Sequence, residues 1–507
     1  MELDGHHLTL EQIEEVAAGA AVAVSAVART RVDQARQFVE RKFAGGEAIY
    51  GVTTGFGRLA HVRVSPADAV ELQLNLVRSH AAGTGEPLPI PFVRAASVLR
   101  ANSLSAGHSG IKPDTLDLIL AMLARGVTPV VPCQGSVGAS GDLAPLAHMT
   151  LVLIGEGEAY YDGRRLPGGV ALEQAGLAPI QLGPKEGLAL VNGTQVMTGI
   201  AALGVLRAER LAAAADLIGA MSLEAYLGSD RAFDRRLNDL RPHPGQERVA
   251  ANLRDLLEGS EIVQSHRECE RVQDPYSFRC IPVVHGAVRD SIAHVRRVTE
   301  IEANSVTDNP LVFAEDEEFI SGGNFHGEPV ALAIDFLKIA ASELASIAER
   351  RLYLLLNAAD RELPLFLTRQ VGLQSGLMLV QYTAAALVNE NKGLGWPSSI
   401  DSIPTSAGQE DHVSMGMTSA NAMPRVLDNV EGALACELIG ACAATDFRRP
   451  LRSGRGTQAA HAVTRERIAP WTTDRPPAPD IATARELIRS GELLRAAESA
   501  IARKLSP

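Results

Sequence analysis

Apolar residues recur at helical spacing along most of the chain, and glycine-rich segments separate the periodic stretches. Residues 8–43 predict two helices, and Thr9 is placed to cap the first of them. A third helix is expected over 66–79, and two more are expected between 91 and 125. The run LAPLAHMTLVL, residues 143–153, begins a further helix. The first part of the chain is therefore predicted to be largely helical.

Longer helical patterns dominate the rest of the sequence. Residues 330–363 contain neither glycine nor proline, and a helix of that length would extend ~50 Å. Such a helix needs neighbours along its whole side, which favours a bundle. Residues 156–184 are rich in glycine and proline and predict a hairpin or an irregular surface segment. We expect a mainly α fold, with an N-terminal domain over 1–190 and a central long-helix bundle with C-terminal helices over 191–507.

The composition excludes several classes of protein. A net charge of −12 argues against nucleic-acid binding, because neutralising phosphates requires a basic surface. The N-terminus is acidic and the apolar runs are interrupted by charges, so neither a signal peptide nor a membrane span is expected. The cysteines are odd in number, widely spread and without a CxxC pair: Cys133, Cys269, Cys280, Cys436 and Cys442. They predict no disulfide framework and no zinc site, and reduced thiols fit the cytoplasm.

The segment GSVGASGDLAPLAHM, residues 135–149, carries the most specific chemistry. If the Gly141 nitrogen attacks the Ala139 carbonyl carbon, five backbone atoms close into a ring. Loss of two waters then leaves an imidazolinone in which Ser140 has become an exocyclic methylidene. Glycine lets the nitrogen approach without a Cβ in the way, and serine supplies a hydroxyl that can be eliminated. This segment therefore predicts an electrophile made from the main chain.

Polar residues gather at several other places. Tyr50 opens the glycine-rich loop YGVTTGFG, and His80 follows the third predicted helix. Gln273, Tyr276 and Arg279 recur at three-residue spacing, which would aim all three the same way on a helix or turn. By residue type alone, a tyrosine such as Tyr50 is more often a half-buried packing residue, and His80 would be an ordinary polar residue with its hydrogen bonds satisfied.

A dense polar cluster is expected inside an otherwise apolar bundle. It consists of Gln409, Glu410, Asp411 and His412. Buried charges need partners, so the cluster indicates either a functional site or a structural network of salt bridges. Metal hydrolases and dinucleotide enzymes are excluded, because His285, His326 and His412 lack zinc-ligand spacing and no GxGxxG or P-loop motif occurs.

The segment GSVGASGDLAPL resembles the signature of the aromatic amino acid ammonia-lyases. The resemblance is to the histidine branch of that family, and it extends from the loop at 50–57 to Gly440-Ala441-Cys442. It implies a long-helix bundle of the ammonia-lyase and fumarase-like type, whose N-terminal helical domain carries the electrophile loop. It also implies a homotetramer in which different subunits contribute to each pocket.

The resemblance implies roles for individual residues. Ala139, Ser140 and Gly141 would form a methylidene-imidazolone, so that no soluble cofactor and no metal is needed. Tyr50 would remove the β-proton of the substrate, whose amine adds to the electrophile. The remaining implied pocket residues are His80, Asn192, Gln273, Tyr276, Arg279, Phe325 and Glu410. Among these, Arg279 would bind the substrate carboxylate by paired hydrogen bonds, and Asn192 would help to hold the bound amino acid.

The implied reaction converts L-histidine to trans-urocanate and ammonia, the first step of histidine degradation. His80 and Glu410 would face the imidazole, and a carboxylate left unpaired beside a phenyl ring would disfavour phenylalanine. The chain departs from the histidine branch at Thr53, Gly408 and Trp396-Pro397-Ser398-Ser399. A tyrosine or phenylalanine ammonia-lyase or aminomutase is the alternative, and a non-catalytic helical scaffold is a remoter one.

Overall fold

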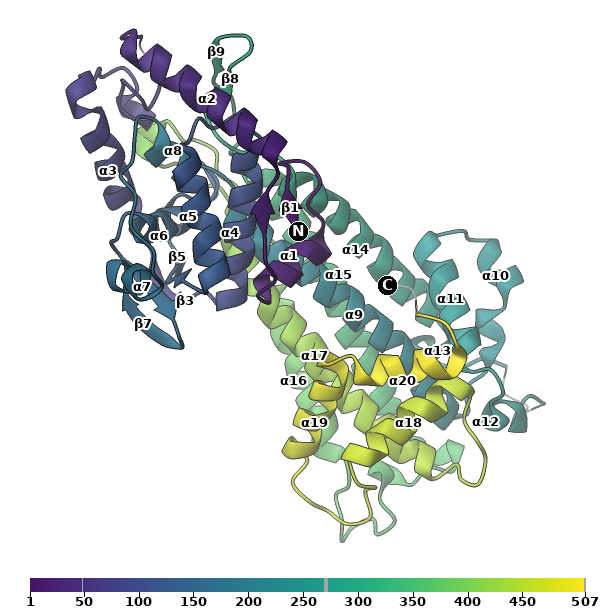
Figure 1. The fold of residues 1–507 in the computed structure, drawn as a ribbon. Coiled ribbons are helices and arrows are strands. Elements are labelled where there is room, and N and C mark those ends of the chain that lie inside the picture. Colours follow the sequence, from purple (N-terminus) through teal and green to yellow (C-terminus); the bar gives the residue numbers. More distant parts are fainter. Residues whose placement is uncertain (48, 269–271, 506–507) are drawn as a thin grey trace. The chain divides into compact units, whose positions relative to one another are not determined.

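The computed structural model describes residues 1–47, 49–268 and 272–505, and it is mainly helical as predicted (Figure 1). Cys269 lies outside the described residues. The chain divides into two compact units. The first unit comprises Met1–Leu206, Val295–Asp335 and Pro397–Ala422, and the second comprises Arg207–His294, Phe336–Trp396 and Met423–Pro507. The N-terminal domain expected over 1–190 lies wholly in the first unit, whereas 191–507 contributes residues to both.

Four long helices each have residues in both units. They are α9 (Gln195–Tyr226), α14 (Ile281–Ala303), α15 (Glu328–Leu356) and α17 (Gly416–Asp446). Helix α15 was predicted to continue to residue 363 but ends at Leu356, which makes it about 44 Å long. After it, Glu362 adopts a left-handed conformation and the buried Arg361 packs over the Tyr226 ring at 4.5 Å. The helix therefore ends before the next proline in the sequence, Pro364, and the segment that follows packs on Tyr226.

The first unit contains eight further helices and all the strands of the described residues. The helices are α1 (Leu10–Ala17), α2 (Ala26–Ala44), α3 (Ala69–His80), α4 (Ile90–Ser105), α5 (Pro113–Arg125), α6 (Leu143–Leu153), α7 (Gly168–Gln174) and α8 (Glu186–Val191). Three pairs of strands form two-stranded sheets: β1 (Glu2–Leu3) with β2 (Ala23–Val24), β3 (Thr84–Pro87) with β5 (Pro132–Gln134), and β8 (Leu311–Phe313) with β9 (Glu318–Ile320). A three-stranded sheet has β6 (Glu158–Tyr161) at its centre, between β4 (Thr128–Pro129) and β7 (Arg164–Pro167). All these pairs are antiparallel except β1 with β2.

Local sequence explains several of these elements. Thr9 caps α1 as predicted, and its side chain and that of Gln12 form a reciprocal capping box. The hairpin predicted within 156–184 is β6–β7, where Asp162 and Gly163 both have positive φ, as a tight two-residue turn requires. Helix α4 is buried on nearly all sides, which identifies it as the centre of the unit.

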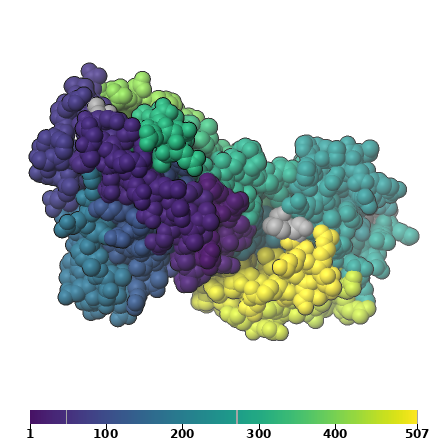
Figure 2. Space-filling model, turned by 45° about the horizontal axis from the view of Figure 1, so that its top comes forward, coloured from purple at the N-terminus to yellow at the C-terminus, as the bar shows by residue number. Residues whose placement is uncertain are grey.

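The hairpin β8–β9 was not predicted. Its residues Val312 and Phe319 pack against Phe38 and Val39 of α2, and the rings of Phe38 and Phe319 lie 5.0 Å apart. Figures 1 and 2 both show this hairpin beside α2. Its three-residue strands are too short to show an alternating pattern, so the segment 307–331 was expected to be a loop leading into a helix.

The second unit is built from the remaining parts of the long helices and eight shorter ones. These are α10 (Arg235–Asp239), α11 (Pro244–Leu256), α12 (Glu261–Ser265), α13 (Tyr276–Arg279), α16 (Met378–Leu394), α18 (Arg455–Arg467), α19 (Ala478–Arg489) and α20 (Glu492–Ile501). Its core contains fully buried ionisable side chains that are hydrogen-bonded to one another. Arg351 donates to Glu437 at 2.5 and 2.9 Å, and Asp216 accepts from His285 at 2.8 Å. Burial lowers the pKa of His285, so the imidazole is favoured in its neutral form.

No helix in the described ranges is both long enough and apolar enough to span a lipid bilayer. The four described cysteines, Cys133, Cys280, Cys436 and Cys442, are all free thiols. Cys436 and Cys442 are buried, and burial raises the pKa of both thiols.

The Arg351–Glu437 pair generates a stability prediction. Arg351→Leu leaves a fully buried carboxylate without its main partner, so we expect the free energy of unfolding to fall by about 3–5 kcal/mol. Urea denaturation measures this loss. The matched control is Arg425→Leu, which breaks the exposed pair with Glu390 and should cost much less, because water screens both charges. Equal losses in the two variants would show that the burial of the Arg351 pair is unimportant.

Candidate active site

The loop that carries the candidate chemistry is a tight turn over residues 138–141. Gly138 and Gly141 face each other in an isolated antiparallel bridge, and their φ angles are +74° and +67°. A Cβ on Gly141 would lie 2.0 Å from the Gly193 carbonyl oxygen. Only glycine fits at this position, both because of its left-handed backbone and because of the close approach of Gly193.

Hydrogen bonds hold the turn from both sides. The Gly138 carbonyl oxygen accepts from the Ser414 hydroxyl at 3.2 Å and from the Gly327 N–H at 3.3 Å. On the other side, Asp142 N–H donates to the Gly193 carbonyl oxygen at 2.7 Å. The predicted condensation requires Ala139 and Gly141 to be held in a sharply bent backbone. The residues present fit that requirement.

Ser140 lies at the centre of the turn, with each of its oxygens in a defined environment. Its carbonyl oxygen accepts from the Gly193 N–H at 3.3 Å, and its hydroxyl donates to Glu410 Oε1 at 3.4 Å. The Asn192 amide is nearby and almost fully buried. When its oxygen accepts from Asn309 N–H at 2.9 Å, its nitrogen donates to the Ser140 carbonyl oxygen at 3.3 Å. Asn192 and Gly193 therefore provide two donors for one carbonyl oxygen.

Asp142, which follows the turn, connects it to the start of α9. Its Oδ2 accepts from the backbone N–H groups of Val196 and Met197 at 2.8 and 2.9 Å. An acidic side chain is favourable there, because the first N–H groups of a helix have no partner within the helix. Burial raises the pKa of Asp142 to about 7, although the two backbone hydrogen bonds act in the opposite direction.

Tyr50 lies in a loop that the rest of the unit holds firmly. Its hydroxyl oxygen accepts from the Gly57 N–H at 3.0 Å, and its ring meets Phe56 edge-on. The fully buried Gln73 donates to the Gly51 carbonyl oxygen at 2.9 Å and accepts from Leu188 N–H at 3.2 Å. The Tyr50 loop is thereby attached to α3 and α8.

His80 is the last residue of α3. Its Nδ1 lies 2.9 Å from the Leu76 carbonyl oxygen, an acceptor, so Nδ1 carries the proton and Nε2 is left to accept. Burial lowers the pKa of His80, and the carboxylate of Glu410 partly offsets this effect. His80 is therefore favoured in its neutral form.

Glu410 is held by its own loop. Its Oε2 accepts from the Thr405 hydroxyl at 2.5 Å, while Oε1 faces Ser140. A Cβ on Gly57 would lie 2.7 Å from Ser406 Oγ, which shows that the Tyr50 and Glu410 loops are in contact. Glu410 thus belongs to the same site as Tyr50 and Ser140.

The prediction that the polar cluster at 409–412 lies inside an apolar bundle was wrong. Gln409, Asp411 and His412 are exposed, and only Glu410 is partly buried. The segment is an irregular loop before α17, where water solvates its charged residues, and no buried salt-bridge network is needed.

The other predicted residues divide into two groups. Phe325 is half-buried and lies two residues before Gly327, which contacts the turn. Gln273, Tyr276 and Arg279 belong to the second unit, and their place in the pocket stays a prediction. Tyr276 is 72% exposed with the Arg279 guanidinium over its ring at 4.7 Å. Gln273 precedes α13, so the expected helical alignment of all three does not extend to it.

The three departures from the histidine pattern have different surroundings. Thr53 is buried, and its hydroxyl donates to the Glu47 carbonyl oxygen at 2.6 Å, which supports the Tyr50 loop. Gly408 is exposed with φ at +81°, and a Cβ there would meet no neighbour. Trp396 is 71% exposed and lies in the second unit.

Sequence reasoning missed the residues that support the site. Gln73, Arg100 and Gly193 hold the Tyr50 loop and the Asn192 turn, yet none belongs to an unusual motif. The Asn192-Gly193 dipeptide is a turn signal that could have suggested a close backbone contact. Gln73 and Arg100 lie in ordinary helical patterns, which contain no signal of their role.

The chain is similar to known proteins over most of its length. A sequence model of the aromatic amino acid lyase family matches residues 8–466. The histidine ammonia-lyase of Anaeromyxobacter sp. (strain K) is 56% identical over 501 residues, which cover 97% of this chain and 99% of the relative.

Solved structures are similar over nearly the same length. Histidine ammonia-lyase from Trypanosoma cruzi superposes with a TM-score of 0.92 at 40% identity, covering 100% of this chain and 95% of that one. A tyrosine aminomutase from Streptomyces globisporus superposes with a TM-score of 0.94 at 39% identity, covering 99% of this chain and 98% of that one. The fold is therefore shared by proteins with different substrates.

The buried carboxyl of Asp142 generates a pH prediction. Folding raises its pKa from 3.8 to about 7, so the folded protein binds more protons than the unfolded chain between these values. This group therefore lowers stability progressively as the pH rises through that window. Asp142→Asn cannot ionise, so its free energy of unfolding relative to wild type should rise by up to about 4 kcal/mol between pH 4 and pH 7. Urea denaturation across this range measures the change, and a constant difference would contradict it.

Proposed function

The chain belongs to the aromatic amino acid lyase family and is a carbon–nitrogen lyase, and from this premise we propose that it converts L-histidine to trans-urocanate and ammonia. This reaction would make it the first enzyme of histidine degradation. The choice of substrate rests on one observation. The Glu410 carboxylate lies 3.4 Å from the Ser140 hydroxyl, and its negative charge acts on the pKa of the nearby His80. An acid and a neutral imidazole therefore border the reacting centre.

The electrophile of the proposal comes from the turn at 139–141. Ala139, Ser140 and Gly141 would condense with loss of two waters into a methylidene-imidazolone, which supplies an electrophilic carbon for the substrate amine. The tight turn and the absence of room for a side chain at Gly141 support this assignment. Asn192 and Gly193 would hold the Ser140 carbonyl oxygen in place.

Tyr50 is the proposed base that takes the β-proton of the substrate. Its oxygen already accepts one hydrogen bond from Gly57, and Gln73 fixes the loop that carries it. A base has to be placed within hydrogen-bond reach of the proton that it removes. These hydrogen bonds fix the Tyr50 hydroxyl relative to its own loop.

Specificity for histidine would come from Glu410 and His80. The substrate imidazole has two nitrogens, and a carboxylate and a neutral histidine can satisfy both. A phenyl or phenol ring would leave the Glu410 carboxylate less well paired, which costs affinity. The similarity to a tyrosine aminomutase makes tyrosine the alternative substrate.

We also propose a homotetramer in the cytoplasm, with Gln273, Tyr276, Arg279 and Phe325 completing the pocket. Support for association comes from exposed apolar side chains on α15 and α16 of the second unit, namely Phe336, Ile339, Leu379 and Tyr382. The exposure of Tyr276 leaves it free to reach a pocket of another copy. The free thiols fit a reducing compartment.

Intact mass tests the electrophile directly. The purified protein should be lighter than its sequence by two water molecules, whereas the Ser140→Ala variant, which has no hydroxyl to eliminate, should have the full mass of its own sequence. We expect this variant to lose activity by at least about 1000-fold, because the reacting carbon is absent, while its circular dichroism and thermal unfolding stay close to wild type. A wild-type chain with both waters still present would refute the proposed reaction.

Substrate choice is tested with Glu410→Gln. This change removes the charge that faces the imidazole, so kcat/KM for histidine should fall by about 10- to 100-fold with little loss of stability. The matched control is Asp411→Asn, an exposed neighbour that should leave the kinetics near wild type. Histidine, tyrosine and phenylalanine are assayed separately by ammonia release. Turnover of tyrosine without turnover of histidine would establish the alternative substrate.

A further inference from the structure

Arg100 of α4 is a buried cation directly behind the Asn192 turn. Its side chain is almost fully buried, and Nη1 donates to the Asn192 carbonyl oxygen and to Gln195 Oε1, both at 2.8 Å. Its Nε and Nη2 have no hydrogen-bond partner among the described residues. Burial lowers the pKa of Arg100 to about 10, so the guanidinium keeps its charge at neutral pH.

The nearby buried charges do not neutralise Arg100. Asp308 is the acidic group that acts on it, but Oδ2 of Asp308 binds the buried Lys185 ammonium at 2.8 Å. Asp308 is therefore shared between two buried cations. An uncompensated buried charge is costly to keep, which points to a use beyond packing.

A single peptide group connects Arg100 to Ser140. The carbonyl oxygen of the Asn192–Gly193 peptide accepts from Arg100, and the N–H of the same peptide donates to the Ser140 carbonyl oxygen at 3.3 Å. The peptide is planar and conjugated, so a positive charge at its oxygen makes its N–H a stronger donor. Gly193 has a φ of +145°, and a Cβ there would lie 2.7 Å from Arg100 Nη1. Glycine therefore permits this close approach.

We propose that Arg100 is a positioning residue whose charge, acting through the Asn192–Gly193 peptide, promotes the loss of water from Ser140 that creates the electrophile. This inference rests on the proposed function. The dehydration breaks the Cα–H and Cβ–Oγ bonds of Ser140, places the C–H electron pair in the new Cα=Cβ double bond, and releases the proton and the hydroxyl as water. As the Cα proton leaves, negative charge develops on the Ser140 carbonyl oxygen, where Gly193 N–H stabilises it.

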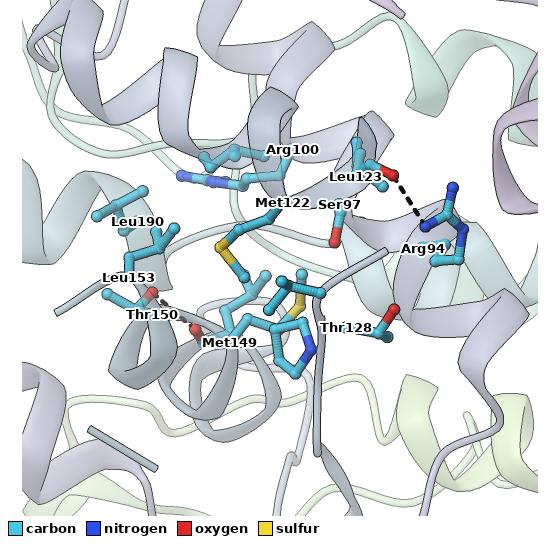
Figure 3. A pocket seen from close by; sticks show the side chains of 14 residues that line it. Arg94, Ser97, Arg100, Met122, Leu123, Thr128, Met149, Thr150, Leu153 and Leu190 are labelled. Atoms are coloured by element: carbon cyan, nitrogen blue, oxygen red, sulfur yellow. Dashed lines mark hydrogen bonds between the residues drawn. The ribbon is translucent and has the colours of Figure 1, made fainter. Parts of the chain in front are cut away.

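The surroundings of Arg100 strengthen this effect. A cavity of about 30 Å³ adjoins it, lined mostly by apolar side chains such as Met122, Met149 and Leu190 (Figure 3). A water there would satisfy the remaining guanidinium donors, but the space is too small for bulk solvent. Solvent therefore screens the charge of Arg100 only weakly at the peptide that it contacts.

Arg94 provides a matched control. It lies on the same helix, is also buried and lines the same cavity (Figure 3). It donates instead to the backbone carbonyl oxygens of Val16, Ala17 and Leu123. Replacing Arg94 removes a buried guanidinium without touching the Asn192 turn.

The test follows dehydration by intact mass at intervals after a pulse of synthesis, for wild type, Arg100→Gln, Arg100→Lys and Arg94→Gln. We expect Arg100→Gln to lose its waters about 10- to 100-fold more slowly than wild type. Arg94→Gln should lose them at the wild-type rate even if its thermal stability falls. Arg100→Lys keeps the charge and should restore much of the rate, which a purely structural role for Arg100 does not predict.

Each outcome decides one question. A wild-type chain with both waters still present refutes the proposed function itself. If the wild type is dehydrated and Arg100→Gln loses its waters as fast as Arg94→Gln, the proposed role of Arg100 is overturned. It is also overturned if Arg100→Lys loses its waters no faster than Arg100→Gln. If Arg100→Gln does not unfold cooperatively, the result for Arg100→Lys decides. A folded Arg100→Lys protein that loses its waters supports the proposal, and a folded one that never loses them overturns it.

Discussion

The close contact between the turn at 138–141 and Gly193 is the constraint on which the site depends. A Cβ on Gly141 would lie 2.0 Å from the Gly193 carbonyl oxygen, so Gly141 cannot carry a side chain, and the bridge between the two residues brings the start of α9 against the turn. Ser414 and Gly327 hold the opposite side of the same turn. Segments from three distant parts of the sequence therefore contact the turn.

The charges near this turn are arranged around the same contact. Asp142 accepts hydrogen bonds from the first N–H groups of α9, and Arg100 donates to the carbonyl oxygen of the Asn192–Gly193 peptide, which precedes that helix. Both side chains are buried at a cost, and both are placed where they hydrogen-bond backbone groups. Glu410 differs, because it is only partly buried and faces the reacting residue from a loop. The interior charges thus support the backbone, whereas Glu410 suits contact with a ligand.

Much of the helical architecture could be predicted because it depends on local pattern. The helices of the first 153 residues follow apolar periodicity and capping residues such as Thr9, which act within a few positions of the chain. The end of α15 at Leu356 could not be predicted, since no glycine or proline lies there in the sequence. The exposure of the cluster at 409–412 was predicted wrongly, because residue type alone does not tell a buried charged loop from a solvated one.

The sequence by itself determined the family to which the chain belongs and indicated the segment of the proposed electrophile, because the chemistry of ring closure demands particular residue types in consecutive positions. It also indicated Tyr50, His80, Asn192 and Glu410, whose neighbouring motifs are distinctive. Only the tertiary structure decided that Gln73 and Arg100 hold the site together. Their hydrogen bonds join backbone groups that are far apart along the chain, and no local pattern records such a contact.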